Sequence, residues 1–189
     1  MSLLKKIKID RSIVLVGLMG AGKTTVGRRL AKKLALEFVD SDHEIEKAAC
    51  MSVAEIFENF GEEEFRSGER RVISRLIDGP PKIIATGGGA FINDETRNLI
   101  LRDALSIWLD ADIDVLVERT ARRDTRPLLK NGDPRAILTE LAEKRSPFYA
   151  EADLKVYSGD GPHEDVVGDI LKALQSKKRS ASPLKQGTL

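Results

Sequence analysis

Residues 13–30 read IVLVGLMGAGKTTVGRRL, and this stretch decides the fold. Its first four residues are apolar and mostly β-branched, which is typical of a strand that is buried on both faces. Residues 17–24 match the pattern G-x-x-x-x-G-K-[ST], and Val26, Leu30 and Leu34 form the apolar stripe of a helix. A strand, a glycine-rich turn and a helix in this order predict a phosphate-binding loop.

The turn contains the residue types that a bound nucleotide needs. Glycines let consecutive backbone N–H groups curl inward around phosphate oxygens. Lys23 would supply positive charge to the β- and γ-phosphates, and Thr24 would supply a hydroxyl ligand for Mg²⁺. The alternative is a structural turn with an incidental lysine, and the flanking strand and helix argue against it. We therefore expect the nucleotide to be bound by Gly20, Ala21, Gly22, Lys23, Thr24 and Thr25.

Further short apolar runs follow at 38–39, 82–86, 105–109 and 154–157, each ending at polar residues or glycine. Between the runs, the patterns predict helices at 23–36, 52–60, 62–77, 112–122, from 133 onward, and 165–174. This alternation predicts an α/β fold in which helices flank a parallel sheet in three layers. We expect one domain over 12–175, a loop at about 122–133 that can close over a nucleotide, an extension at 1–11 and a disordered tail at 176–189.

Composition narrows the classes of partner and cofactor. The 189 residues include 31 Lys and Arg against 30 Asp and Glu, and the net charge of +1 gives no reason to expect nucleic acid or an anionic membrane. A single cysteine, Cys50, excludes an internal disulfide and a cysteine-based zinc site. No apolar run reaches membrane-spanning length, and the N-terminus is a poor signal peptide. We therefore expect a cytoplasmic protein.

Two carboxylates follow the second apolar run, at Asp40 and Asp42. Ligands of open α/β sheets bind at the carboxyl ends of the strands. One carboxylate there could serve Mg²⁺ through water, and another could orient or deprotonate an acceptor hydroxyl. The alternative is that Asp42 caps a helix over 42–49 while Asp40 is a solvated turn residue. Asp110, at the end of another run, is a rival for the magnesium side.

Arginines and glycines supply further candidates. Arg66, Arg126 and Arg145 each have the planar guanidinium that pairs with carboxylate or phosphate, although surface arginines are abundant in this chain. Gly87, Gly88 and Gly89 follow a strand directly, and they allow either close approach of a ligand to the backbone or a flexible turn.

Taken together, these features resemble the shikimate kinases over about residues 12–175. The resemblance rests on GLMGAGKTTVGRRLA, FVDSD, SVAEIF…GEEEFR…E, TGGGA, TRPLL and KRSPFYAEAD in this order. It implies a P-loop kinase of the nucleoside-monophosphate-kinase-like fold, with a five-stranded parallel sheet in the order 2-3-1-4-5 and a mobile lid. It also implies ATP-dependent phosphorylation of shikimate to shikimate 3-phosphate with release of ADP, a step of chorismate and aromatic amino-acid biosynthesis. Mg²⁺ would be the cofactor and ATP the co-substrate, and we expect a monomer.

The resemblance also implies roles on the nucleotide side. Lys23 and Thr24 would serve the phosphates and Mg²⁺, and Asp40 would hold the Mg²⁺ shell through water. Arg126, on the lid, would bridge toward the transferring phosphate, and Arg119 would stack near adenine. The loop at 158–162 has no cation, so no side chain in it is assigned to adenine.

On the acceptor side, the resemblance implies that Asp42 hydrogen-bonds the shikimate hydroxyls and acts as the base. Arg66 and Arg145 would hold the shikimate carboxylate, and Glu69 would position Arg66. The backbone of Gly87, Gly88 and Gly89 would contact the ring hydroxyls. The catalytic set would thus comprise Asp42, Lys23 and Arg126.

Two other functions stay open. One is another small-metabolite kinase of the same fold, such as a gluconate-type kinase. The other is a nucleotide-dependent regulatory module, which would bind or hydrolyse ATP without transfer to a small acceptor.

Overall fold

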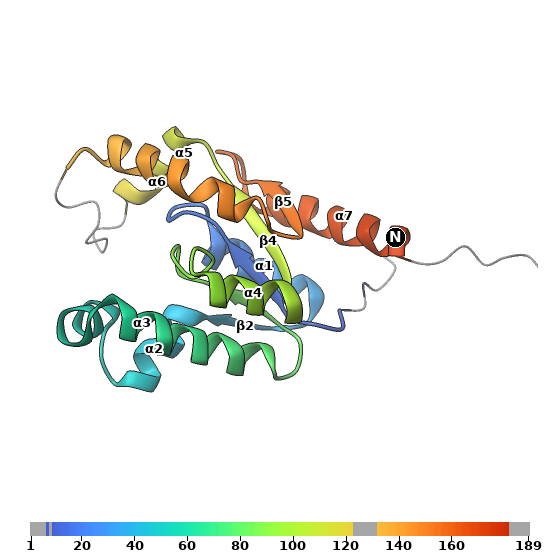
Figure 1. Cartoon of the computed structure of the whole chain (residues 1–189). Coiled ribbons are helices and arrows are strands. Elements are labelled where there is room, and N and C mark those ends of the chain that lie inside the picture. Colours follow the sequence, from blue (N-terminus) through green and yellow to red (C-terminus); the bar gives the residue numbers. More distant parts are fainter. Residues whose placement is uncertain (1–6, 8, 123–131, 182–189) are drawn as a thin grey trace, which may run out of the picture.

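The computed structural model describes residues 7, 9–122 and 132–181. Five strands form one parallel sheet in the order β2-β3-β1-β4-β5 (Figure 1). The central strand pairs with β3 on one side and with β4 on the other, and its four residues are completely buried. The predicted fold class and strand order are therefore confirmed. The strands are β1 (Ile13–Val16), β2 (Glu37–Asp40), β3 (Lys82–Ala85), β4 (Leu105–Asp110) and β5 (Leu154–Tyr157).

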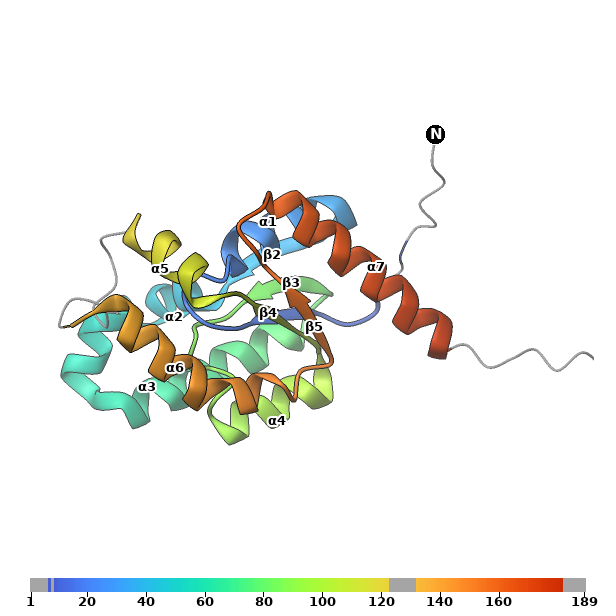
Figure 2. The ribbon, with the colours of Figure 1, turned by 90° about the horizontal axis from the view of Figure 1, so that it is seen from above.

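Helices cover both faces of the sheet. Figure 2 shows α1 (Lys23–Leu34) and α7 (His163–Ala181) on one side, and α3 (Val53–Ile77), α4 (Asp94–Asp103) and α6 (Pro134–Tyr149) on the other. The helix α2 (Ser41–Ala49) packs on α3, and α5 (Ile113–Ala121) packs on α6. In the described part of the chain, no helix is long and apolar enough to cross a membrane.

Three features of the helices follow from local sequence. Ser52 and Glu55 form a reciprocal capping box at the start of α3. Gly61 bends α3, because its φ of 79° and ψ of 178° are not helical. Asp133 accepts hydrogen bonds from the first backbone N–H groups of α6, whose first residue is proline. The predicted break at Gly61 and the predicted helix start at 133–134 are confirmed.

One helix was not predicted, and one prediction about a helix was wrong. No helix is predicted between 90 and 104, yet α4 occupies much of that range. Its apolar residues Leu99, Ile100 and Leu101 are consecutive and form no stripe, so only the Asn93 cap and the acidic first turn mark it.

The wrong prediction concerns 176–181, which the sequence places in a disordered tail but which continue α7 as far as Ala181. Lys177 anchors this extension, since its Nζ donates to Oδ1 of Asp153 at 2.7 Å. At the other terminus, Ile7 and Ile9 of the predicted extension pack against the core.

Candidate active site

The loop between β1 and α1 depends on glycine conformations. Gly17 has a φ of 135°, and a Cβ there would lie 2.5 Å from the carbonyl oxygen of Leu109. Gly22 is the N-cap of α1 with a φ of 94°, and it offers no side-chain cap to the helix. The first N–H groups of α1 therefore remain available to an anion, and the positive end of the helix dipole favours one.

Lys23 places its charge directly over this loop. Its Nζ donates to the carbonyl oxygens of Gly17 at 2.7 Å and Leu18 at 2.8 Å. The loop thus combines a cation with a helix N-terminus, which is the arrangement expected of a site for nucleotide phosphates.

Asp40 and Thr24 meet at the end of β2. The Thr24 hydroxyl donates to Oδ2 of Asp40 at 3.0 Å, and Oδ1 of Asp40 accepts from the backbone N–H of Asp42 at 3.2 Å. Asp40 is therefore the N-cap of α2, and the alternative in which Asp42 caps that helix is wrong. Asp40 has this role because its extended backbone, with φ of −105° and ψ of 120°, aims its carboxylate at the helix start.

A hydroxyl beside a carboxylate fits Mg²⁺, which prefers oxygen ligands and keeps several of its waters. Among the described residues, no group of three or more His, Cys, Asp or Glu could hold a metal ion. Water and nucleotide phosphate would have to complete the coordination of a cation bound at Thr24 and Asp40. The rival carboxylate, Asp110, instead pairs with Lys155 at 2.9 Å and does not line the cavity described below.

Asp42 lies in the first turn of α2, where its carboxylate faces the turn after β3. A Cβ on Gly87 would come within 2.7 Å of Oδ1 of Asp42, so only glycine fits there without a shift of that carboxylate. Burial raises the pKa of Asp42, and the negative charge of Asp40 raises it further. Lys23 and Arg66 oppose this change without reversing it. A half-buried carboxylate with a raised pKa is suited to accept a proton.

Arg66 projects from α3 toward the same turn. Its Nη1 donates to Oε2 of Glu69 at 2.7 Å, and its Nη2 lies 3.4 Å from Oε1 of Glu62. The Glu69 side chain is only 1% exposed, and burial raises its pKa although Arg66 lowers it. The predicted contact between Glu69 and Arg66 is therefore present. The guanidinium of Arg66 also fills the space that a Cβ on Gly89 would need.

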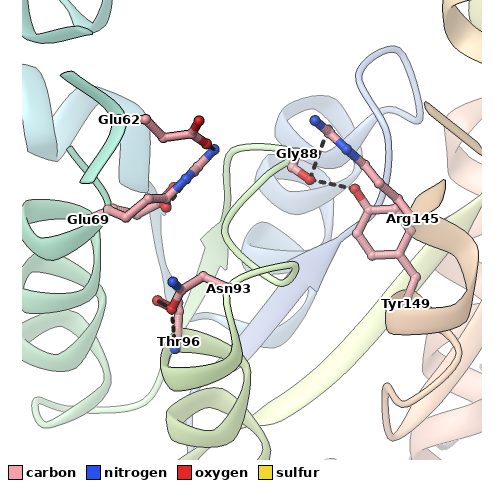
Figure 3. Close-up of polar contacts among 8 residues, drawn as sticks. Glu62, Glu69, Gly88, Asn93, Thr96, Arg145 and Tyr149 are labelled. Atoms are coloured by element: carbon pink, nitrogen blue, oxygen red, sulfur yellow. Dashed lines mark hydrogen bonds and ion pairs between the residues drawn. The ribbon is translucent and has the colours of Figure 1, made fainter. Parts of the chain in front are cut away.

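Arg145 approaches the turn from α6. Its Nη1 donates to the carbonyl oxygen of Gly88 at 3.3 Å. Figure 3 shows Glu62 and Glu69 of α3 on one side of Gly88, with Arg145 of α6 on the other. Arg66 and Arg145, which lie far apart in sequence, are thus brought to one glycine turn, and together they can hold a small anion.

A cavity of about 300 Å³ joins the phosphate loop to the glycine turn. Arg119 of α5 borders the cavity and links α5 to the phosphate loop and to the loop after β5. Its Nη1 donates to Oγ of Ser158 at 3.1 Å and to the carbonyl oxygen of Gly20 at 3.5 Å. Its Nη2 donates to the carbonyl oxygen of Gly159. The residues that line the cavity are Met19, Gly20, Gly22, Lys23, Thr24, Thr25, Asp40, Asp42, Thr86, Gly87, Gly88, Arg119, Arg122 and His163.

Among the residues at this site that the sequence analysis did not assign, His163 and Tyr149 have buried polar groups. His163 lines the cavity with its ring against Gly22, and its Nδ1 is buried without a hydrogen-bond partner among the described residues. Burial lowers its pKa, and the charges of Arg119 and Arg29 lower it further. Tyr149 donates to the carbonyl oxygen of Gly88 at 2.5 Å. It lies within the KRSPFYAEAD motif, four residues after Arg145 on the same face of a helix, but no role was assigned to it.

The predicted site residues on the phosphate loop, at the end of β2, on the glycine turn and at Arg66, Arg119 and Arg145 therefore gather around one region. Their functional roles stay predictions. Arg126 lies outside the described residues, as does most of the predicted lid at 122–133.

Known proteins are similar to this chain in sequence and in fold. The family model described as shikimate kinase matches residues 19–175. The shikimate kinase of Caulobacter vibrioides is 57% identical over 165 residues, which cover 87% of this chain and 82% of that protein. A solved structure of the shikimate kinase from Acinetobacter baumannii in complex with shikimate has a TM-score of 0.86 and 38% identity, and the match covers 92% of this chain and 98% of that one.

A gluconokinase from Sinorhizobium meliloti is a more distant neighbour, with a TM-score of 0.63 and 17% identity over 92% of this chain and 96% of that one. At this identity the likeness shows a common fold alone. The family model, by contrast, covers the phosphate loop from Met19 onward, the glycine turn, Arg66 and Arg145. Because that match covers most of the chain and relatives are more than half identical to it, this protein belongs to the shikimate kinase family.

Proposed function

We propose that this protein transfers the γ-phosphoryl group of ATP to a ring hydroxyl of shikimate, giving shikimate 3-phosphate and ADP. This reaction belongs to the biosynthesis of chorismate and the aromatic amino acids. The observation that carries the proposal is the convergence of Arg66 and Arg145 on the turn at Gly88 and Gly89, one side chain from each neighbouring helix. Two guanidinium groups at one turn match a small acceptor with a carboxylate.

Asp42 supports the assignment of the acceptor hydroxyl. It lies between the phosphate loop and the glycine turn, so a hydroxyl bound there would face both the base and the phosphate donor. Little covalent chemistry is needed from the protein in phosphoryl transfer, and catalysis comes mainly from positioning and charge stabilisation. Asp42 would orient the hydroxyl and accept its proton, while Lys23 would stabilise charge on the transferred group.

Thr24 and Asp40 would hold Mg²⁺, the first through its hydroxyl and the second through water. When bound, the cation neutralises charge on the phosphates. Arg119 would lie near the adenine, and Arg126 of the lid would reach toward the transferring phosphate. We further propose that the protein acts as a monomer in the cytoplasm.

A coupled assay of ADP release tests this function, with ATP and Mg²⁺ and with shikimate, gluconate or no acceptor. We expect release that depends on shikimate, together with a phosphorylated shikimate product in mass spectrometry. Release with gluconate alone would overturn the proposed acceptor while leaving the nucleotide site intact. Release without any acceptor would favour the regulatory module.

A further inference from the structure

Tyr149, the last residue of α6, has a buried hydroxyl that the proposed reaction does not use. The residue is only 1% exposed, and its ring lies 5.9 Å from that of Trp108, measured between centroids. The hydroxyl donates to the carbonyl oxygen of Gly88 at 2.5 Å (Figure 3). Burial raises the pKa of Tyr149 to about 12, so the hydroxyl keeps its proton at neutral pH.

This hydrogen bond sets the orientation of one peptide group in the glycine turn. No peptide bond in the described chain is cis. In a trans peptide the carbonyl and the following N–H point in opposite directions. Because the Gly88 carbonyl points at Tyr149 on α6, the N–H of Gly89 points away from α6. Among the described residues this N–H has no hydrogen-bond acceptor, so it remains available to a ligand.

The other end of the turn is held independently. Arg97 of α4 is nearly buried and donates to the carbonyl oxygens of Phe91 at 3.3 Å and Ile92 at 3.1 Å. Its Nε donates to Oε2 of Glu151 at 3.1 Å. Loss of the Tyr149 hydroxyl would therefore allow the Gly88–Gly89 peptide group to rotate, because glycine backbone has few steric limits. The rest of the turn would stay held by Arg97.

Arg145 donates a hydrogen bond to the same carbonyl oxygen as Tyr149, that of Gly88. Both groups donate to the Gly88 carbonyl, but the bond from Arg145 is longer, at 3.3 Å. While the hydroxyl satisfies this carbonyl, the other N–H groups of the guanidinium can bind an anion. Without the hydroxyl, Arg145 would be the main donor to the carbonyl, and its guanidinium would be drawn away from a ligand.

We propose that Tyr149 is a positioning residue for the acceptor: its hydroxyl holds the Gly88–Gly89 peptide so that the N–H of Gly89 and the guanidinium of Arg145 both face the bound acid. The inference rests on the proposed function, because it assigns this turn to a hydroxylated carboxylate. Tyr149 touches the turn and not the reacting atoms, so its effect appears in acceptor binding.

The test compares Tyr149→Phe with Tyr157→Phe, which removes an exposed hydroxyl bonded to Asp112. A misplaced Gly89 N–H and a diverted Arg145 guanidinium should weaken shikimate binding by about tenfold, which corresponds to the loss of one net hydrogen bond. We expect the KM and calorimetric Kd for shikimate to rise by that factor in Tyr149→Phe, with the KM for ATP within about twofold of wild type. Tyr157→Phe should match wild type in all three constants. Unchanged shikimate constants, or equal rises for shikimate and ATP, would overturn the proposal.

A second variant tests the route through Arg145. In an Arg145→Lys background, Tyr149→Phe should raise the KM for shikimate by clearly less than in wild type, because residues that act through one another are not additive. If Tyr149→Phe raised the KM for shikimate by the same factor in both backgrounds, Tyr149 would not act through Arg145.

Backbone NMR separates this inference from the proposed reaction, since it needs no substrate. Apart from residue 149 and its immediate neighbours in α6, the largest amide shift changes in Tyr149→Phe should fall on Gly88 and Gly89, whether or not the wild-type protein phosphorylates shikimate. Glycine amides at their wild-type positions would overturn the inference alone. A wild-type enzyme inactive toward shikimate would overturn the proposed function alone.

Discussion

Asp42 is a half-buried carboxyl group whose pKa is influenced by two cations, Lys23 and Arg66. Burial raises its pKa the most, Asp40 adds to the rise, and Lys23 and Arg66 counteract it. The balance of these opposing effects on the pKa of Asp42 matters because a general base works best when its pKa approaches the operating pH. The nearby carboxylate of Asp40 differs in its environment, since it caps α2 and accepts from Thr24. Two neighbouring aspartates therefore differ in their surroundings, which fits the separate roles proposed for them.

Replacing Asp42 with Asn should retain ATP binding and reduce kcat by on the order of 10²-fold or more, because the amide cannot accept the proton. In the wild type, kcat should fall toward acid pH with an apparent pKa above the ordinary value of 3.8, since protonation removes the base. Initial rates of ADP release against pH measure both effects. Asp110→Asn is the matched control and should keep its turnover. Normal turnover of Asp42→Asn would refute the role of base.

A substitution of Arg66 tests whether this side chain binds the carboxylate of shikimate. Arg66→Lys should raise the KM for shikimate by roughly tenfold, because an ammonium cannot reproduce two parallel hydrogen bonds. The KM for ATP should stay near its wild-type value. Arg71→Lys, an exposed change on the same helix, serves as the control in steady-state kinetics. An unchanged KM for shikimate in Arg66→Lys would remove this side chain from the acceptor site.

At the scale of elements, α3 is bent, and the segment after the bend carries two of the predicted site residues. Its first segment begins at the capping box of Ser52, and its second segment carries Arg66 and Glu69 one turn apart. The bend at Gly61 separates the two segments at a backbone conformation that side chains rarely adopt. A continuous helix would direct the second segment differently relative to the glycine turn.

Gly61→Ala should lower the free energy of unfolding by about 1–3 kcal/mol through backbone strain. Backbone strain is the only cost expected, because an added Cβ would meet no atom within 4 Å and would cause no steric clash. Gly68→Ala on the same helix is the matched control, and there an added Cβ also meets nothing within 4 Å. Because Gly68 is helical, that change should stabilise by about 0.5–1 kcal/mol. Urea unfolding of both variants measures the difference, and equal effects would argue against strain at Gly61.

At the scale of the whole molecule, Asp153 connects the sheet with α7. Its Oδ2 accepts from the backbone N–H and the hydroxyl of Ser106 on β4, both at 3.0 Å. Its Oδ1 accepts from Lys177 on α7 at 2.7 Å. Burial alone would raise the pKa of Asp153, but the bonds from Lys177 and Ser106 outweigh it, and the pKa is lowered.

Stability from Asp153 should therefore depend on pH. A pKa below the ordinary 3.8 means that the contribution is complete above that pH and is lost as the pH falls through the lowered value. At neutral pH, Asp153→Asn should reduce the free energy of unfolding by about 1–3 kcal/mol. Urea unfolding at several pH values should show this difference shrinking in acid. Asp169→Asn, which affects only an exposed pair with Lys172, should have little effect at any pH. A loss that is constant with pH would mean that the charge of Asp153 contributes nothing.

The sequence by itself determined the parts whose physical cause is local. The phosphate loop is one contiguous stretch, so its glycines, Lys23 and Thr24 could be read directly from the chain. The parallel sheet follows from the alternation of buried strands with helices. Helix α4 was not predicted because its apolar residues form no stripe. The end of α7 was not predicted because an ion pair with Asp153, distant in sequence, stabilises it.

Only the tertiary structure decided which side chains share a site. Asp40 rather than Asp110 meets Thr24, because β2 and α1 bring them together while Asp110 pairs with Lys155. The glycine turn is contacted from both sides because α3 and α6, separate in sequence, pack beside it. The contact of Tyr149 with Gly88 likewise joins residues 61 positions apart. Such contacts depend on how elements pack, and packing is a property of the whole chain that no local pattern contains.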